Sequence, residues 1–125
     1  MNSRGTVSHY FPCSGKMDSV TGHDVKGVFD LYSYCLQNVE LSGPTLFGPL
    51  LKEVVAQATI AYQRDPNYYS VSLILTDGAI HDMQLAKDWI VEGSLLPLSI
   101  IVIGIGNADF SLMEELDSDN QVIYD

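Results

Sequence analysis

The hydrophobic and polar residues of the chain follow a helical period in four segments. Residues 25–39 and 46–65 carry apolar side chains at every third or fourth position, which predicts two long amphipathic helices. Residues 83–94 show the same period and predict a third helix. A fourth, short and acidic helix is predicted near residues 109–116.

Two other segments are typical of strands. "SVSLILT" at 70–76 and the apolar run at 98–104 are short and are bounded by turn residues. The second is apolar at almost every position, which predicts burial on both faces, as in a parallel sheet. Weaker patterns favour short strands at 6–11 and 121–125. Because a helix joins the two best strands, we expect a right-handed βαβ crossover and a three-layer α/β fold with a mostly parallel sheet.

The charge of the chain limits its partners. The 125 residues suit one domain, and six basic against sixteen acidic residues give a formal net charge of −10. Such a charge argues against nucleic acid, which requires a basic face, and against direct attachment to anionic lipid. A bridging divalent cation or a basic protein partner fits better, although simple solubility also explains the charge.

The two cysteines and the apolar runs indicate the compartment. Cys13 and Cys35 form no CxxC motif, so we expect neither a zinc site nor a disulfide framework, and we expect both thiols to be reduced. The first residues lack the apolar core of a signal peptide. The run at 95–106 is too short to span a membrane. The sequence therefore predicts a cytoplasmic protein.

Asp77 is the leading candidate for chemistry. It follows the 70–76 strand directly, and ligands of α/β folds bind at the carboxyl ends of strands. A carboxylate there, followed by the flexible Gly78, suits a hard cation such as Mg²⁺ or Mn²⁺. The alternative is that Asp77 closes an Asx-turn in the loop.

A hydroxyl and a second carboxylate lie at other loop–helix junctions. Thr45 could ligate the same cation as Asp77, or it could cap the helix that follows. Asp82 is interpreted as the cap of the 83–94 helix rather than as a group near the metal. His9, His23 and His81 lie far apart and have no zinc-site spacing.

Motifs for catalysis or nucleotide binding are weak. The chain contains no G-x-S-x-G nucleophile elbow and no convincing Cys/His pair. "GIGNAD" at 104–109 has two glycines after a strand, but it lacks the third glycine and a phosphate-binding lysine. Gly104 and Gly106 are therefore expected to serve close packing and turn geometry.

Four segments in order resemble the copine A-domain, a relative of the von Willebrand factor A (integrin I-like) domain. They are "VSHYF" at 7–11, "LSGPTLFGPLL" at 41–51, "SLILTDGAIHDM" at 72–83 and "LPLSIIVIGIGNADFSLMEELDSD" at 96–119. The resemblance covers nearly the whole chain. It implies a Rossmann-like sheet with a metal-ion-dependent adhesion site (MIDAS), whose threonine and later aspartate fall on Thr45 and Asp77.

The chain departs from the family pattern in one important respect. A MIDAS also needs a D-x-S-x-S loop, and this sequence contains none; "DLYSY" at 30–34 has the wrong third residue. We therefore expect residues 1–125 to form a partial A-domain that binds Mg²⁺ or Mn²⁺ weakly, with Ser42, Gly43 and Gly78 shaping the rim. Loss of the central strand would also leave the 70–76 strand as an exposed sheet edge, which favours self-association.

The resemblance implies a non-enzymatic protein-interaction module that captures an acidic residue of a partner. Copines bind phospholipid in a calcium-dependent way through two C2 domains, which this chain lacks, so we expect membrane recruitment only as part of a longer protein. Three rivals stay open. They are the substrate-recruiting domain of a copine-like RING ubiquitin ligase, a small hydrolase or nucleotide-binding domain, and an inactive truncated product.

Overall fold

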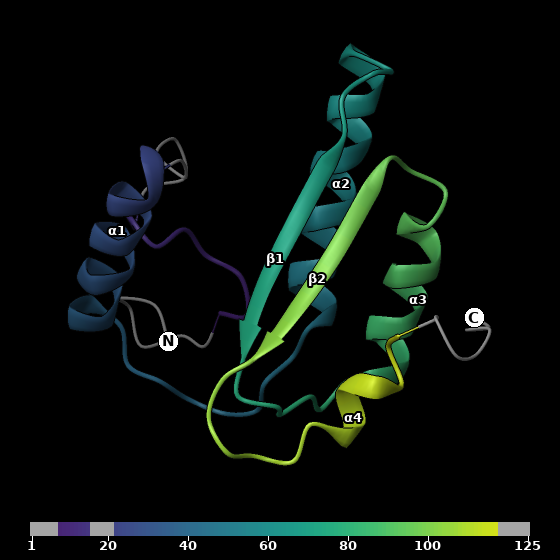
Figure 1. Ribbon diagram of the computed structural model, residues 1–125. Helices are drawn as coiled ribbons and strands as arrows, with labels where there is room; N and C mark the ends of the chain where they lie inside the picture. The colour runs from purple at the N-terminus through teal and green to yellow at the C-terminus, as the bar shows by residue number, and fades with distance from the viewer. Residues whose placement is uncertain (1–7, 16–21, 118–125) are drawn as a thin grey trace. The chain divides into compact units, whose positions relative to one another are not determined.

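A computed structural model describes residues 8–15 and 22–117 of the chain. The chain divides into two compact units, residues 1–43 and 44–125, and each is described by itself. The second unit contains helices and a parallel sheet, which confirms an incomplete α/β fold (Figure 1).

The described part of the first unit contains one helix, α1 (Asp24–Asn38), which confirms the helix predicted at 25–39. The Asp24 carboxylate accepts a hydrogen bond from the Gly27 backbone N–H at 3.1 Å and so satisfies a donor of the first turn. The strand predicted at 6–11 is wrong for residues 8–11, which form none; residues 6 and 7 lie outside the described residues. Within the described part of this unit there is no strand with which that segment could pair.

The described elements of the second unit follow the predicted order. They are α2 (Gly48–Arg64), β1 (Ser70–Thr76), α3 (Met83–Gly93), β2 (Leu98–Gly104) and α4 (Ser111–Glu114). Both strands have the predicted bounds, whereas α4 is shorter than predicted. The strand predicted at 121–125 lies outside the described residues. β1 and β2 pair in parallel from Ser70↔Leu98 to Thr76↔Gly104.

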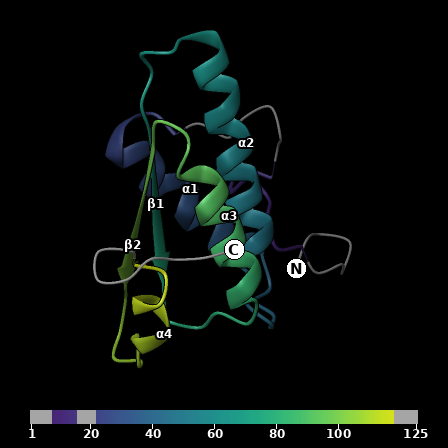
Figure 2. The same cartoon turned by 90° about the vertical axis from the view of Figure 1, so that its right-hand side faces the viewer.

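Two helices cover one face of this sheet. Figures 1 and 2 show α2 and α3 on the same side of the two strands. The core between these layers is small and apolar: Phe47, Leu51, Ile74, Ile80, Ala86 and Leu116. Leu51 is 1% exposed and Ala86 is fully buried. This packing fixes the loops at the carboxyl ends of the strands, where the candidate site lies.

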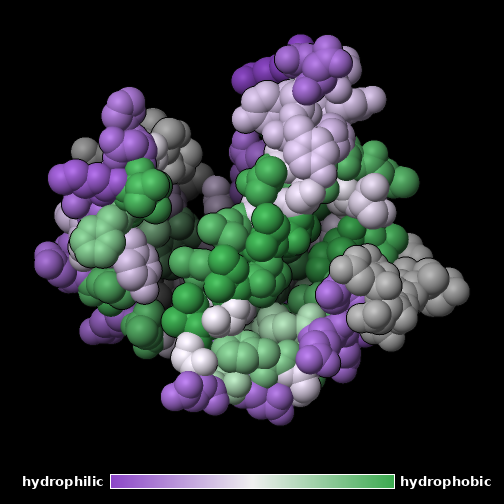
Figure 3. Space-filling view, in the orientation of Figure 1, coloured by the Kyte–Doolittle hydropathy of each residue, from purple (hydrophilic) through white to green (hydrophobic). Residues whose placement is uncertain are grey.

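No described helix of the second unit covers the other face of the sheet, which we call the bare face. Alternate residues of both strands point to it and are between 42% and 62% exposed: Val71, Leu73, Leu75, Ile101 and Ile103. Figure 3 shows them as a continuous hydrophobic surface over the strands. The expected burial of 98–104 on both faces is therefore wrong for the described structure, because within residues 44–117 helices pack on one face only.

None of the helices that the structure describes is both long and apolar enough to cross a lipid bilayer.

Candidate functional site

The loop after β1 begins with the predicted ligand Asp77. Gly78 has a φ of +106°, a conformation that side-chain-bearing residues rarely adopt, and this allows the sharp turn that the sequence predicts. The Asp77 carboxylate accepts a hydrogen bond from the Ala79 N–H at 3.3 Å, which is the Asx-turn alternative. Asp77 is nevertheless exposed, and its second carboxylate oxygen is available to a cation.

Thr45 is held against this loop by two hydrogen bonds. The Thr45 N–H donates to His81 Nδ1 at 2.8 Å, and the His81 N–H donates to the Thr45 carbonyl at 2.9 Å. Since Nδ1 accepts, the bonding assigns the ring proton of the neutral imidazole to Nε2. The structure thus brings the Thr45 segment to the loop that starts at Asp77, although the two segments are more than thirty residues apart in sequence.

Asp82 also holds residues 45–48 to the loop after β1, because its side chain caps α2. Its two carboxylate oxygens accept the N–H groups of Phe47 and Gly48 at 2.8 and 2.7 Å. A Cβ at Gly48 would come 2.8 Å from Asp82 Oδ2, so glycine permits this close approach. The negative charge also lies at the positive end of the helix dipole. We call these four hydrogen bonds, from residues 81 and 82 to residues 45–48, the capping clip.

The expected role of Asp82 as the cap of α3 is therefore wrong. Asp82 occupies the N-cap position of α3, but its side chain makes no cap hydrogen bond there. The physical reason lies in α2, whose N-cap position is Phe47 and which has no capping side chain of its own. Its first N–H groups need an acceptor from elsewhere. Thr45 does not provide it, so the alternative role of Thr45 as a helix cap is also not observed.

This capping could have been anticipated from one signal. The segment "LFGP" at 46–49 starts a helix without Ser, Thr, Asp or Asn at the cap position. Buried backbone donors are almost always satisfied, so such a start requires an acceptor distant in sequence. The sequence alone does not say which carboxylate supplies it.

The loop after β2 adds a second carboxylate to this edge of the sheet. The Asp109 side chain accepts a hydrogen bond from the Ser111 N–H at 2.9 Å, and this bond, with a further one from the Ser111 hydroxyl, lowers the pKa of Asp109 from 3.8. A Cβ at Gly78 would lie 3.1 Å from the Asp109 carbonyl, so the two loops lie close together. Two exposed carboxylates therefore mark this edge.

The glycines of "GIGNAD" have the roles that the sequence predicts. A Cβ at Gly104 would come within 2.6 Å of the Phe110 ring, so Gly104 allows this ring to pack on the strand end. Gly106 has a φ of +93° and forms the turn.

The donor set for a cation is small. Thr45 and Asp77 offer one hydroxyl and one carboxylate, whereas Mg²⁺ prefers six oxygen ligands. No three His, Cys, Asp or Glu side chains among the described residues gather as a metal site. The predicted rim residues Ser42 and Gly43 belong to the first unit, where both are exposed and the Ser42 hydroxyl donates to the Gly43 carbonyl at 3.3 Å.

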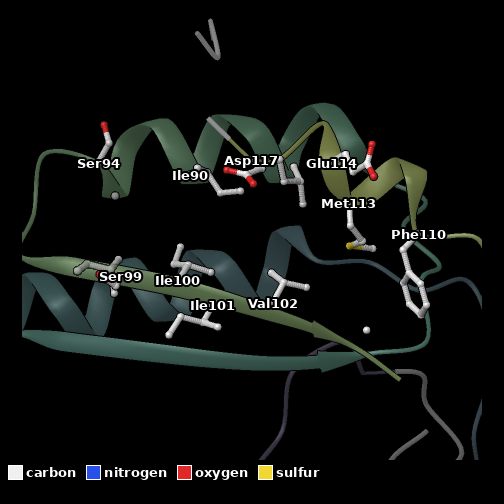
Figure 4. A pocket seen from close by; sticks show the side chains of 14 residues that line it. Ile90, Ser94, Ser99, Ile100, Ile101, Val102, Phe110, Met113, Glu114 and Asp117 are labelled. Atoms are coloured by element: carbon white, nitrogen blue, oxygen red, sulfur yellow. The ribbon is translucent and has the colours of Figure 1, made fainter. Parts of the chain in front are cut away.

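A separate hollow of about 950 Å³ runs along β2 between α3 and α4 (Figure 4). Its floor is apolar and includes Ile90, Ile100, Val102 and Met113, with Glu114 among the few charged groups. The described lining contains no His, Cys, Lys or Arg. Its charged groups are the carboxylates of Glu114 and Asp117.

Comparison with known proteins covers the whole chain. The family model described as Copine matches residues 1–125. Protein BONZAI 1 of Arabidopsis thaliana is 42% identical over 113 residues, which are 90% of this chain and 20% of BONZAI 1. Protein BONZAI 2 of the same plant is 41% identical over 113 residues, 90% of this chain and 19% of BONZAI 2. The chain thus spans about a fifth of the length of these curated relatives.

Proposed function

Because the chain belongs to the copine family, we propose that it is a non-enzymatic protein-interaction module with a degenerate divalent-cation site at the carboxyl end of β1. The observation that carries this proposal is the capping clip. It joins the Thr45 segment to the loop that begins at Asp77, and this supports a site that uses the Thr45 hydroxyl and the Asp77 carboxylate.

The site would recruit a partner through the cation. Thr45 would ligate Mg²⁺ or Mn²⁺ directly, and Asp77 would ligate directly or through water. Because these two groups leave most of six coordination positions open, water and an acidic side chain of the partner would complete the shell. Gly78 would shape the rim. A single protein carboxylate gives weak binding, since affinity for hard cations rises with the number of charged ligands.

Calorimetric titration of the 125-residue chain with Mn²⁺ tests this function. Asp77→Asn keeps an acceptor for the Ala79 N–H but removes the charge, and we expect it to abolish saturable binding. Asp65→Asn is the matched control, because Asp65 also closes an Asx-turn, accepting the Asn67 N–H at 2.9 Å, but precedes β1. Thr45→Val should weaken binding without unfolding the chain.

Two outcomes of this titration contradict the proposal. One is that the unmodified chain shows no saturable heat. The other is that Asp65→Asn and Asp77→Asn reduce binding equally, which would mean that Mn²⁺ responds only to the overall charge of −10.

We also propose that the isolated chain associates with itself through its sheet. In the described structure β1 pairs only with β2, so each strand has an open edge, and the apolar side chains of one face are exposed. Unpaired edges and exposed apolar faces favour association. Sedimentation velocity at several concentrations measures it, and a chain that stays monomeric at every concentration contradicts it.

Charge and family membership suggest where this module acts. We propose that it binds neither nucleic acid nor lipid directly, because its net charge of −10 repels both. We further propose a cytoplasmic location, with recruitment to phospholipid membranes as part of a longer copine-family protein. Binding of the chain to phosphatidylserine vesicles without calcium would contradict this.

A further inference from the structure

The hollow along β2 has an apolar floor that the proposed cation site does not use. Figure 4 shows Ile90 of α3 and Met113 of α4 pointing towards β2. Ile100 and Val102 of β2 point into the same space. All four side chains are half-buried and pack against the core of the second unit. Their remaining apolar surface is in contact with water, and a ligand that covers it gains hydrophobic free energy.

The charged groups that line the hollow are acidic. Glu114 and Asp117 belong to its described lining, and both are exposed. We call these two residues the acidic rim. The basic residue Lys87 of α3 does not offset them, because its Nζ atom pairs with Glu115 Oε2 at 3.2 Å. A ligand that carries basic groups beside apolar ones therefore matches both the floor and the rim.

The form of the hollow favours a peptide over a small molecule. Its volume of about 950 Å³ is at the upper end of the range for small-molecule sites, which usually surround the ligand with convergent polar groups. Here the floor is apolar, and it lies between two helices on a sheet. Grooves of this kind receive the apolar face of an amphipathic helix. The flexible side chain of Met113 can adapt to such a face.

We propose that this hollow binds a basic amphipathic helix of a partner protein. Apolar side chains of the helix cover the floor, and its Lys or Arg side chains lie beside Glu114 and Asp117. The apolar contacts supply most of the affinity, whereas the acidic rim selects a basic helix over an acidic one. The same acidic groups disfavour a membrane of anionic lipid as the occupant. This binding requires no cation, so it is independent of the proposed site at Asp77.

Fluorescence anisotropy with a labelled synthetic helix of leucine and lysine, with all leucines on one face, tests this proposal. The helix is titrated with the whole 125-residue chain in the presence of EDTA, which removes divalent cations. We expect saturable binding that weakens as the salt concentration rises. Two control peptides should bind much more weakly. One has glutamate in place of every lysine, and the other has the same residues in an order that spreads the leucines around the helix.

Two matched variants of the chain locate the binding. Glu114 of α4 and Glu92 of α3 are both exposed glutamates, but only Glu114 lines the hollow. Glu114→Lys should weaken binding of the leucine–lysine helix by about tenfold, because it places like charges together. Glu92→Lys makes the same change in net charge and should weaken binding by less than about twofold. Urea unfolding followed by Trp89 fluorescence establishes that both variants are folded.

Amide NMR of the chain with the leucine–lysine helix shows where the helix lies. The expected shifts are confined to residues 90–102 and 110–117. The proposal is overturned if the helix does not bind saturably, or if Glu92→Lys and Glu114→Lys weaken binding equally. It is also overturned if the shifts fall on the bare face, around Leu73 and Leu75, or if nuclear Overhauser contacts show that another segment of this chain fills the hollow.

Discussion

Replacing Asp82 by alanine tests the capping clip most directly. The carboxylate accepts two N–H groups of the first turn of α2, and both donor residues are buried. Removal of one capping side chain costs about 0.5–2 kcal/mol of unfolding free energy. Here two charge-assisted hydrogen bonds are lost, and each contributes about 1.5–3 kcal/mol when fully formed. Water can bind the exposed N–H groups in the variant and so recover part of this energy. We expect Asp82→Ala to lower the unfolding free energy by about 2–3 kcal/mol.

A graded series separates the hydrogen bonds from the charge. Asp82→Asn keeps one carbonyl oxygen of the right shape but loses the second acceptor and the interaction with the helix dipole, so its expected cost is about 1–2 kcal/mol. Asp88→Ala is the control. Asp88 lies on α3 and accepts a hydrogen bond from the exposed side chain of Gln84. Removal of the Asp88 carboxylate should change the unfolding free energy by no more than about 0.5 kcal/mol.

Urea unfolding followed by Trp89 fluorescence is the suitable assay. Trp89 is the only tryptophan of the chain and packs against the core of the second unit, so its signal reports the unit that contains the clip. If Asp82→Ala and Asp88→Ala have the same midpoint and the same slope, Asp82 does not stabilise the start of α2. An order in which Asp82→Asn is more harmful than Asp82→Ala would also refute the reasoning.

Three further predictions concern the same unit. Gly104→Ala should lower the unfolding free energy by about 1–3 kcal/mol in the urea assay, because the new Cβ would come within 2.6 Å of the Phe110 ring; unchanged stability would show that the ring moves freely. Ser111→Pro removes both donors to Asp109, so carboxyl NMR should show its pKa rising toward 3.8, and the stabilisation from this lowered pKa, present above about pH 4 and lost as the pH falls through the folded value, should disappear. Leu73→Gln on the bare face, where Leu73 is 58% exposed, should reduce self-association in sedimentation velocity with little effect on the fold; unchanged association would exclude this face.

The elements of the second unit were predictable because local pattern and packing agree there. β1 and β2 end where the apolar runs end, and the period of α2 matches its buried residues Leu51, Val55 and Ala58. Gly78 and Gly106 follow from turn geometry, and both have positive φ. In these segments the local sequence pattern and the tertiary packing favour the same secondary structure, so the pattern alone predicts it.

Long-range contacts could not be predicted in the same way. Asp82 precedes an amphipathic helix and therefore matches an N-cap pattern, yet it caps a helix that begins 34 positions earlier. The period of 98–104 predicts two buried faces, but Ile101 and Ile103 are exposed because the described helices pack on one face only.

A cation site requires ligands in the right position and enough negative charge. The capping clip bears on each requirement differently. For the proposed site the clip concerns position, because His81 and Asp82 hold the Thr45 segment to the loop after β1 through hydrogen bonds to its backbone groups. Charge is met only in part, since Asp82 uses both of its oxygens on α2 and Asp109 is engaged by Ser111. Asp82 therefore serves the backbone, whereas Asp77 is exposed and uses only Oδ1 on the Ala79 N–H. In the proposed site, Thr45 and Asp77 would supply one hydroxyl and one carboxylate, so an acidic side chain of a partner would add more to binding than a further protein hydroxyl.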